Sequence, residues 1–445
     1  MKINLRNNRT LMRVSMTLHD LSNLEQPPEL RITASQNLAK AADQTIAGFT
    51  QSMMKKPEQF APNRYPIYLE GGEGAVVRDV DGNEYIDFIC GLAANTLGHN
   101  HPVVNRAIRE NLSKGLIHSL PAPVEIQTAQ TLIDVIPNVD MVRFFKTGAD
   151  ANSAAIRLAR YVTGKEKIVT VGYNGWHDQY MFDTPGVPKV IQDYTHRMPL
   201  FTPADEQPIL DLLAEEGKNI AAVLLSVPYN RMLTREFLVK LREACTEYQV
   251  IFVFDEIVSG FRLALGGAQE YFNVQADLVT LSKGIAAGMP LSAVAGQKEL
   301  MRKIEDLQVS TTFGGEMLSL EVCHGVLNEY KHSNYIDHLS ELGKQLKLLV
   351  NAISERLNTP LKVVGYHPIP MFLFAKNPLE HAKLAEPFLA EMAKRGVLLR
   401  RDVNFICAAH THSQIEYTAK AVEAALEAMI AQGLFEQKEI AEATG

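Results

Sequence analysis

One lysine of this chain, Lys283, has the setting that covalent amine chemistry requires. It follows the apolar run Leu278 to Leu281, which is typical of a buried strand, and Gly284 turns the chain directly afterwards. An amine delivered to the end of a strand can form a Schiff base with an aldehyde cofactor. A lysine in this position is more often a solvated loop residue, so Lys283 alone does not decide the chemistry.

A carboxylate follows a second strand in the same way. The apolar run Val250 to Phe254 leads into Asp255 and Glu256. A carboxylate there can pair with a protonated pyridine nitrogen and keep the ring an electron sink, although acidic residues after a strand also cap helices. Because the carboxyl ends of parallel strands meet at one edge of a sheet, Lys283 and Asp255 together predict a pyridoxal 5'-phosphate (PLP) site.

Two glycine-containing turns could complete such a site. The turn at 147–150 (Thr-Gly-Ala-Asp) separates a strand-like run from a helical one. Free N–H groups at a helix N-terminus bind phosphate, and Gly148 lets the backbone approach the anion closely. In the loop 171–178, Tyr173 and the adjacent Asn174 could contact a planar ring. Either turn alone is typical of any strand-to-helix connection.

Weaker signals come from the rest of that loop and from one later turn. Trp176, the single tryptophan, is expected in the core, and His177 is expected to make structural hydrogen bonds. The hydroxyl-rich turn 310–315 could add a phosphate contact through Thr312, or it could simply cap a helix.

Composition bounds the class of protein. The chain has 445 residues, 46% hydrophobic and 21% charged, with a formal net charge of -7. These values predict a soluble protein of two or three domains whose main partner is not a nucleic acid.

No apolar stretch approaches the ~20 residues of a membrane span, and no apolar core follows the basic residues 1–15, so we expect a cytoplasmic protein with a mobile N-terminal arm. The cysteines show no C-x-x-C spacing and are expected to be buried thiols of a reducing compartment, not disulfides or zinc ligands; they are Cys90, Cys245, Cys323 and Cys407.

The periodicity predicts an α/β fold with a mostly parallel sheet covered by helices. We expect an N-terminal arm with helices and a small sheet at 1–85, a large cofactor-binding domain at 86–320 and a smaller α/β domain at 321–445. The expected strands of the large sheet are Met141 to Phe145, Lys167 to Val171, Ala221 to Val227, Val250 to Phe254, Leu278 to Leu281 and Leu291 to Ala295. The expected helices include Leu38 to Met54, Ala151 to Tyr161, Thr234 to Tyr248 and Ser413 to Gln432, and Asp81-Gly82 is expected to form a hairpin turn.

The order of these motifs resembles that of class III PLP-dependent aminotransferases, in particular the glutamate-1-semialdehyde aminomutase-like branch. The likeness extends from about Tyr65 to the C-terminus and also includes Asp79 to Asp87, Leu97 to Pro102 and Ala408 to Thr411. The resemblance implies the PLP-dependent transferase fold type I and a homodimer with shared active sites.

The resemblance also implies a role for each candidate residue. Lys283 is the Schiff-base lysine and proton shuttle, and Asp255 is the partner of the pyridine nitrogen. Ile257 packs under the ring and Tyr173 stacks on its other face. The remaining implied cofactor contacts are Thr147, Gly148, Ala149, Asn174 and Asn230, together with Thr312, which reaches the neighbouring subunit's cofactor.

Several positions depart from the pattern of the resembled family. Ala149 stands where a hydroxyl residue is usual, Asp150 replaces a glutamate, and Glu316 replaces an asparagine. The segment 226–230 lacks the usual Glu-Pro pair. The aminomutase's glycine-rich substrate motif is absent and residues 61–66 take its place, which weakens the mutase alternative.

The function that this resemblance implies is amino transfer from a donor, with L-glutamate expected, to an aldehyde or ketone. An acceptor such as 8-oxo-3-deoxy-octulosonate, a sugar acid of surface polysaccharide or lipopolysaccharide biosynthesis, fits the turn and loop motifs. Arg400, Arg401 and His410 could bind an acidic sugar, although the arginines would more commonly form a solvated cluster.

Two alternatives stay open at this point. An intramolecular 2,1-aminomutase would need no turnover of an external 2-oxo acid. A non-catalytic PLP-binding regulator is disfavoured, because residues 1–60 contain no basic DNA-reading module and both Lys283 and Asp255 are present. A dinucleotide-binding fold is also disfavoured, since no G-x-G-x-x-G follows an early strand.

Overall fold

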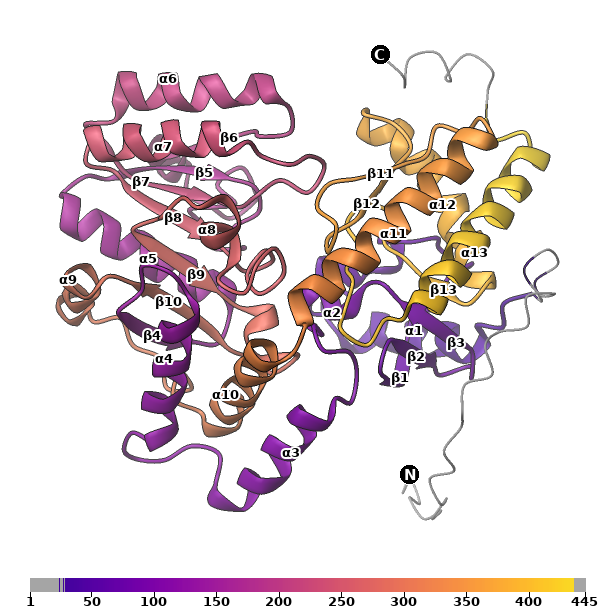
Figure 1. The fold of residues 1–445 in the computed structure, drawn as a ribbon, viewed down its shortest axis with the longest axis horizontal. Helices are drawn as coiled ribbons and strands as arrows, with labels where there is room; N and C mark the ends of the chain where they lie inside the picture. Colours follow the sequence, from indigo (N-terminus) through magenta and orange to yellow (C-terminus); the bar gives the residue numbers. More distant parts are fainter. Residues whose placement is uncertain (1–23, 25–26, 28, 436–445) are drawn as a thin grey trace.

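The computed structural model describes Leu24, Pro27 and residues 29–435. The arm expected at residues 1–15 lies outside these described residues. Figure 1 shows a large sheet with its helices on the left, and a second layer of long helices over a small sheet on the right. Helix α11 (Tyr335–Arg356) runs through the right-hand part, and α10 (Met317–His332) connects the two parts.

The large sheet has seven strands in the order β4-β10-β9-β8-β7-β5-β6. Only β10 runs antiparallel to its neighbours, so the other strands end at the same edge. Their bounds are β4 (Met141–Phe145), β5 (Lys167–Val171), β6 (Thr195–Met198), β7 (Ile220–Leu225), β8 (Ile251–Asp255), β9 (Leu278–Leu281) and β10 (Ser292–Gly296). The predicted strands are confirmed within two residues, and β6 was not expected.

Both faces of this sheet are buried, which explains its continuous apolar strands. Every residue of β7 is buried, and its side chains alternate between two apolar clusters. Ala222 and Leu224 pack in the cluster under helix α5 (Gly148–Thr163), while Val223 and Leu225 pack on the opposite face. The alanine-rich face of α5 lets the helix lie close to the sheet, which fixes the position of its N-terminus.

The smaller part of the protein combines both ends of the chain. Its four-stranded sheet has the order β1-β2-β3-β13, and β13 (Val397–Leu398) lies parallel to β3 (Glu84–Asp87). β1 (Leu69–Glu73) and β2 (Val76–Asp79) pair antiparallel, and the predicted turn at Asp81-Gly82 joins β2 to β3. A two-stranded sheet contains β11 (Lys362–Val364) and β12 (Met371–Leu373). The boundaries proposed for three domains stay a prediction.

The remaining helices cover these sheets. They are α1 (Thr33–Thr45), α2 (Cys90–Ala93), α3 (Pro102–Asn111), α4 (Pro123–Val135), α6 (Glu206–Glu216), α7 (Arg235–Glu247), α8 (Gly267–Phe272), α9 (Lys298–Met301), α12 (Pro378–Lys394) and α13 (His412–Ala431). The helix expected at 38–54 instead spans 33–45. Gly48 and Phe49 have φ angles of 75° and 72°, which a right-handed helix cannot include.

The described residues bear on the expected cysteines and on the expected lack of a membrane span. The four cysteines are free and buried, as expected. Within residues 24–435, apart from the gaps noted above, no helix combines the length and apolarity needed to cross a membrane.

Close packing of α11 generates a stability prediction. Gly343 is buried in this helix, and a Cβ there would clash with the carbonyl oxygen of His367. We expect Gly343→Ala to destabilise the protein by about 1–3 kcal/mol through overpacking, although alanine favours helices. Gly71→Ala is the control, because a Cβ at Gly71 would meet no atom within 4 Å. Equal midpoints of thermal unfolding for the two variants would contradict this packing.

Candidate active site

The parallel strands bring the predicted site residues to one edge of the large sheet. Asp255 is the last residue of β8, Lys283 follows β9, and the 147–150 turn follows β4. Asp255 lies opposite Thr280 in the β8–β9 register. The loop after β5 packs on the β4 turn, because a Cβ at Gly175 would lie 2.8 Å from the Ala149 Cβ. The predicted meeting of these segments is therefore present.

Asp255 is buried and held by amide donors from two other segments. Asn174 Nδ2 donates to Oδ2 at 2.7 Å and Asn152 Nδ2 donates to the same oxygen at 2.9 Å. The backbone N–H of Ile257 donates to Oδ1 at 3.1 Å. Thr280 Oγ1 in turn donates to Asn152 Oδ1 at 2.6 Å. This network fixes the plane of the carboxylate, and Oδ1 keeps acceptor capacity for a further donor.

The protonation of Asp255 depends on what lies beside it. Burial raises the pKa of this carboxyl from its ordinary value, while the hydrogen bonds from Asn174 and Asn152 lower it. A cationic N–H placed next to Oδ1 would also favour the carboxylate. The site therefore suits a protonated ring nitrogen, which both satisfies the buried oxygen and offsets the cost of its burial.

Lys283 lies in a short turn that strains its backbone. The turn spans Lys283–Ala286, and Lys283 has a φ of 47°, which is uncommon for a residue with a side chain. Burial lowers the pKa of its amine to about 8; the negative charge of Asp255 acts against this shift. The positive charges of Arg262 and Arg400 act in the same direction as burial. A larger fraction of this amine is thus neutral near pH 7 than for a solvated lysine.

The predicted phosphate turn is the N-terminus of α5. Thr147 is the N-cap: its hydroxyl accepts from Asp150 N at 3.2 Å, and the Asp150 carboxylate accepts from Thr147 N at 3.0 Å. This pairing explains why an aspartate can replace the usual glutamate here. Helix geometry leaves the N–H groups of Gly148 and Ala149 without an intrahelical acceptor. A Cβ at Gly148 would lie 2.5 Å from Ile257 Cδ1, so only glycine allows this approach.

The loop after β5 presents one aromatic ring and one amide to this edge. Tyr173 is 71% exposed, and Asn174 is buried with its Oδ1 lacking a partner among the described residues. His177 has the expected structural role, since its Nδ1 lies 2.7 Å from Ser153 Oγ. The expectation that Trp176 packs in the core is wrong, because it is 71% exposed at the loop surface.

Two further predicted contacts are less directly connected to Asp255. Asn230 donates from Nδ2 to the carbonyl of Phe201 at 2.8 Å, and its buried Oδ1 lacks a partner among the described residues. Thr312 is exposed on the turn before α10. Glu316, in place of the usual asparagine, caps α10 and pairs with Lys146 at 2.9 Å. The cofactor roles of Asn230 and Thr312 stay predictions.

Two arginines near Lys283 differ from the sequence-based expectation. The expectation that Arg400 belongs to a solvated cluster is wrong, because it is 8% exposed and pairs with Asp402 at 3.0 Å. Arg262, which the sequence analysis did not single out, is fully buried. It donates to the carbonyls of Ala93 at 2.7 Å and Ile406 at 3.1 Å. Both cations lie where the smaller part of the protein meets the large sheet.

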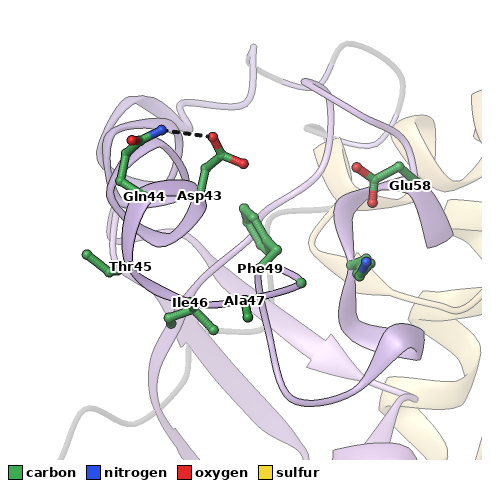
Figure 2. A pocket seen from close by; sticks show the side chains of 9 residues that line it. Asp43, Gln44, Thr45, Ile46, Ala47, Phe49 and Glu58 are labelled. Atoms are coloured by element: carbon green, nitrogen blue, oxygen red, sulfur yellow. Dashed lines mark hydrogen bonds between the residues drawn. The ribbon is translucent and has the colours of Figure 1, made fainter. Parts of the chain in front are cut away.

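A surface pocket elsewhere contains none of the predicted site residues. It lies at the end of α1 and has a volume of about 470 Å³ (Figure 2). Asp43 and Gln44 hydrogen-bond to each other at 3.2 Å on its rim, and Phe49 and Glu58 face it from the following segment. Lys56 is the single lysine of its lining, and none of the predicted cofactor contacts lies there. The pocket is therefore separate from the site described above.

Comparison with known proteins agrees with this geometry. Residues 60–407 match the class III aminotransferase family. The chain belongs to this family. It is 32% identical over 422 residues to a glutamate-1-semialdehyde 2,1-aminomutase of Methanobrevibacter smithii, covering 85% of this chain and 98% of that protein. It is 29% identical to a 3-aminobutyryl-CoA aminotransferase of Cloacimonas acidaminovorans, covering 89% of this chain and 98% of that protein.

A solved structure shows the same fold. The FumI protein of Sphingopyxis sp. MTA144 in a PLP form superposes with a TM-score of 0.85 at 24% identity, covering 91% of this chain and 98% of that one. The protein is thus a PLP-dependent aminotransferase of fold type I. As an enzyme of this family, it is not the non-catalytic regulator that the sequence left open.

The residues at the sheet edge fit PLP. The buried Asp255 oxygen suits the pyridine nitrogen, the glycine-lined helix N-terminus suits the phosphate, and the Lys283 amine, with its lowered pKa, suits the aldehyde. Ile257 and the exposed Tyr173 offer apolar and aromatic surface for a ring. When bound, PLP supplies an electron sink that stabilises negative charge at the carbon next to the amine.

Sequence reasoning missed three polar residues that support Asp255. They are Asn152, Ser226 and Thr280, all buried; Asn174 Nδ2 also lies 3.2 Å from Ser226 Oγ. Asn152 carried a usable signal, because it is a polar residue among the alanines that form the buried face of α5. Thr280, inside an apolar strand, carried a similar one.

The Asp255 network predicts a catalytic cost for removing one donor. Asn152→Ala takes one hydrogen bond from Asp255 and leaves the Thr280 hydroxyl without its acceptor. We expect kcat to fall about 10- to 100-fold, since hydrogen bonds to charged groups contribute about 1.5–3 kcal/mol. Steady-state kinetics at saturating PLP would measure it, with Asn105→Ala as control, because Asn105 is a half-buried residue of α3 whose side chain bonds, among the described residues, only to Asn100. An unchanged kcat would show that Asn152 does not support the carboxylate.

The lowered pKa of Lys283 predicts a pH dependence for cofactor capture. Only the neutral amine attacks an aldehyde, and its fraction rises as pH rises through about 8. After removal of the cofactor, the rate of PLP incorporation into the apoenzyme should therefore increase with a midpoint near pH 8. Nα-acetyl-lysine in solution, with a pKa of about 10.4, is the control. A midpoint near that of the control would contradict the burial of the amine.

Proposed function

We propose that this aminotransferase moves an amino group from L-glutamate to an aldehyde or ketone whose molecule also carries a carboxylate. The observation that supports the proposal is the position of Arg400. Its guanidinium is buried, yet its charge acts on the amine of Lys283. A buried cation whose charge disfavours protonation of the Lys283 amine suits donor and acceptor molecules that are themselves anionic.

Arg400 keeps donors free for a ligand. Its Nε and Nη2 both contact Oδ1 of Asp402, at 3.1 and 3.0 Å, and its backbone N–H donates to Asn404. Guanidinium groups carry five N–H donors and bind carboxylates through two parallel hydrogen bonds. Asp402 uses only part of this capacity, so a substrate carboxylate can be bound beside it.

The chain's own residues then have separate tasks in the proposed reaction. Lys283 Nζ takes the proton from the substrate carbon that bears the amine and returns a proton in the second half-reaction. Asp255 keeps the ring nitrogen protonated, and Asn152 and Asn174 hold Asp255 in place. The N-terminus of α5 would hold the phosphate of the cofactor, and Tyr173 and Ile257 would offer surfaces for its ring.

We propose a sugar acid as the acceptor, for example 8-oxo-3-deoxy-octulosonate. It combines a reactive aldehyde with a carboxylate, which is the pair of groups that Lys283 and Arg400 suit. The turn at 147–150 and the loop at 171–178 support this choice through their resemblance to sugar-acting aminotransferases.

A 2,1-aminomutase is the second candidate. It is favoured by the glutamate-1-semialdehyde 2,1-aminomutases among the relatives, which are 29–32% identical over most of this chain. The segment 61–66, which differs from the aminomutase substrate motif, argues against it. The two candidates differ in one product, because only amino transfer from glutamate releases 2-oxoglutarate.

We also propose that the enzyme is a cytoplasmic homodimer. The exposed Thr312 and its neighbour Phe313, which is 58% exposed, support a subunit contact at the turn before α10, where Thr312 would reach the partner's cofactor. Four buried free thiols support a reducing compartment.

The test is a half-reaction with L-glutamate and no acceptor. We expect the PLP-loaded enzyme to release about one 2-oxoglutarate per site, and Arg400→Gln to raise the glutamate concentration needed by about 10-fold or more, because one charge-assisted contact is lost. Arg401→Gln is the matched control, since Arg401 contacts Gln59. Absence of 2-oxoglutarate, with glutamate-1-semialdehyde converted internally, would favour the mutase. An unchanged glutamate requirement in Arg400→Gln would remove Arg400 from the proposal.

A further inference from the structure

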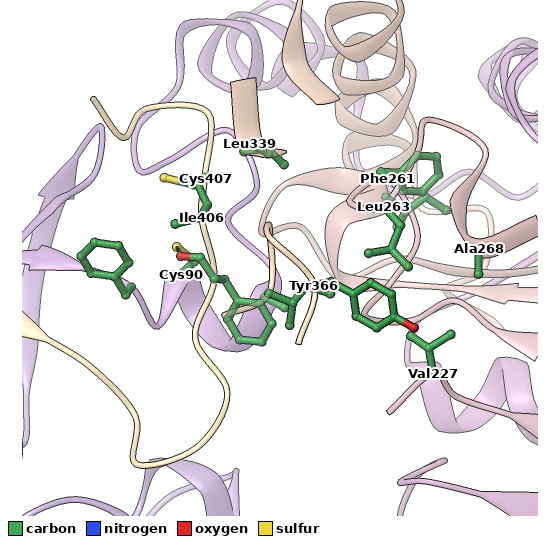
Figure 3. Packing of buried hydrophobic residues seen from close by; sticks show 14 of the residues in the cluster. Cys90, Val227, Phe261, Leu263, Ala268, Leu339, Tyr366, Ile406 and Cys407 are labelled. Atoms are coloured by element: carbon green, nitrogen blue, oxygen red, sulfur yellow. Dashed lines mark hydrogen bonds between the residues drawn. The ribbon is translucent and has the colours of Figure 1, made fainter. Parts of the chain in front are cut away.

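Two cysteines from opposite ends of the chain meet in the core of the smaller part of the protein. Cys90 follows β3, and Cys407 lies in the loop before α13. Their sulfur atoms and a ring nitrogen of His410 all lie within 4.8 Å of one another. Figure 3 shows the side chains of Cys90 and Cys407 on the same side of the cluster, next to Ile406. All three residues of this thiol cluster (Cys90, Cys407 and His410) are buried.

The two thiols have opposite acid–base character. A hydrogen bond from Cys90 holds the pKa of the Cys407 thiol well below its usual range, while the same hydrogen bond raises the pKa of Cys90. His410 Nδ1 lies 3.2 Å from Cys407 Sγ. A thiolate that accepts a hydrogen bond from a second thiol is the arrangement found in dithiols that cycle with disulfides.

The same three side chains resemble a metal site less closely. Structural zinc sites have four ligands, and the cluster within the described residues offers three. The lone pair of His410 Nδ1 already accepts from the backbone N–H of Cys407 at 3.0 Å. Cys90 Sγ faces the carbonyl oxygens of Asp87 and Phe405 at 3.3 and 3.5 Å, which favours a protonated thiol over a thiolate ligand.

The backbone at Cys90 is strained. Cys90, Gly91, Leu92 and Ala93, the residues of α2, have φ angles of 47°, 59°, 59° and 75°, so this short element is a left-handed turn that L-residues with side chains rarely adopt. The carbonyl of Ala93, at the end of this turn, accepts from Arg262, and so does the carbonyl of Ile406 beside Cys407.

We propose that Cys90 and Cys407 form an oxidisable dithiol that a small peroxide converts to a disulfide. The Cys407 thiolate attacks one oxygen of hydrogen peroxide; an S–O bond forms, the O–O bond breaks, and hydroxide leaves. The Cys90 sulfur then attacks Cys407, forming the S–S bond and releasing the second oxygen as hydroxide, which takes the Cys90 proton. The first hydroxide takes up the proton that Cys407 released on ionising, so two thiols lose two electrons and the peroxide becomes two waters. The bond would link the strained turn after β3 to the loop before α13.

The test uses the PLP-loaded enzyme treated with hydrogen peroxide, followed by alkylation and digestion without reductant. We expect a Cys90–Cys407 linked peptide, an intact mass lower by about 2 Da because two hydrogens leave, and reversal by dithiothreitol. Cys90→Ser and Cys407→Ser should each lose the link. Cys245→Ser should retain it, because Cys245 lies in α7 and is not one of the three side chains within 4.8 Å of one another.

Three results would overturn the proposal. The first is oxidation of Cys407 to a sulfinic or sulfonic acid with no link to Cys90, and the second is a link that involves Cys245 or Cys323. The third is a purified enzyme with one tightly held zinc per chain that is lost in Cys407→Ser, which would make the cluster a metal site. Because these readouts are masses and metal content, they do not depend on the substrate proposed above.

Discussion

A single carboxylate taken out of water, Asp255, is the group on which the rest of the site depends. A buried charge is costly unless hydrogen bonds and an opposite charge compensate for it. The protein supplies donors from three separate segments: the α5 residue Asn152, the loop residue Asn174 and the backbone of Ile257. These hydrogen bonds offset part of the free energy that burial of the charge costs, and a cationic ligand would offset the rest. The site therefore favours a protonated ring over a neutral one.

The parallel sheet makes this arrangement possible. The strands β4, β5, β8 and β9 end at one edge, so a helix N-terminus, an aromatic loop, a carboxylate and an amine converge without a long connection. Two buried cations complete the charge balance. Arg400, which lies just after β13 in the smaller part, and Arg262, which lies between β8 and α8, both favour the neutral form of Lys283.

The sequence predicted the strands and helices of the large sheet well, but it did not predict which side chains from different elements contact each other. Strands such as Met141–Phe145 were predicted with their bounds, because continuous apolar runs are typical of a sheet buried on both faces. The support of Asp255 by Asn152 was missed, since it depends on how α5 lies across β8 and not on spacing within either element. Arg400 was expected in solvent because charge alone does not reveal burial, and Trp176 was expected in the core because its size alone does not fix its place. Domain boundaries are also hard to predict from sequence, because strands far apart in the chain can pair: β13 pairs with β3.

The central claim is that Lys283 holds PLP at the edge where Asp255 lies. The most direct measurement is to reduce the purified enzyme with borohydride, which makes a lysine–PLP bond permanent, and to map the modified peptide by mass spectrometry. The account predicts one pyridoxyl group per chain, located on Lys283. A pyridoxyl group on another lysine, or an enzyme that takes up no PLP, would contradict it.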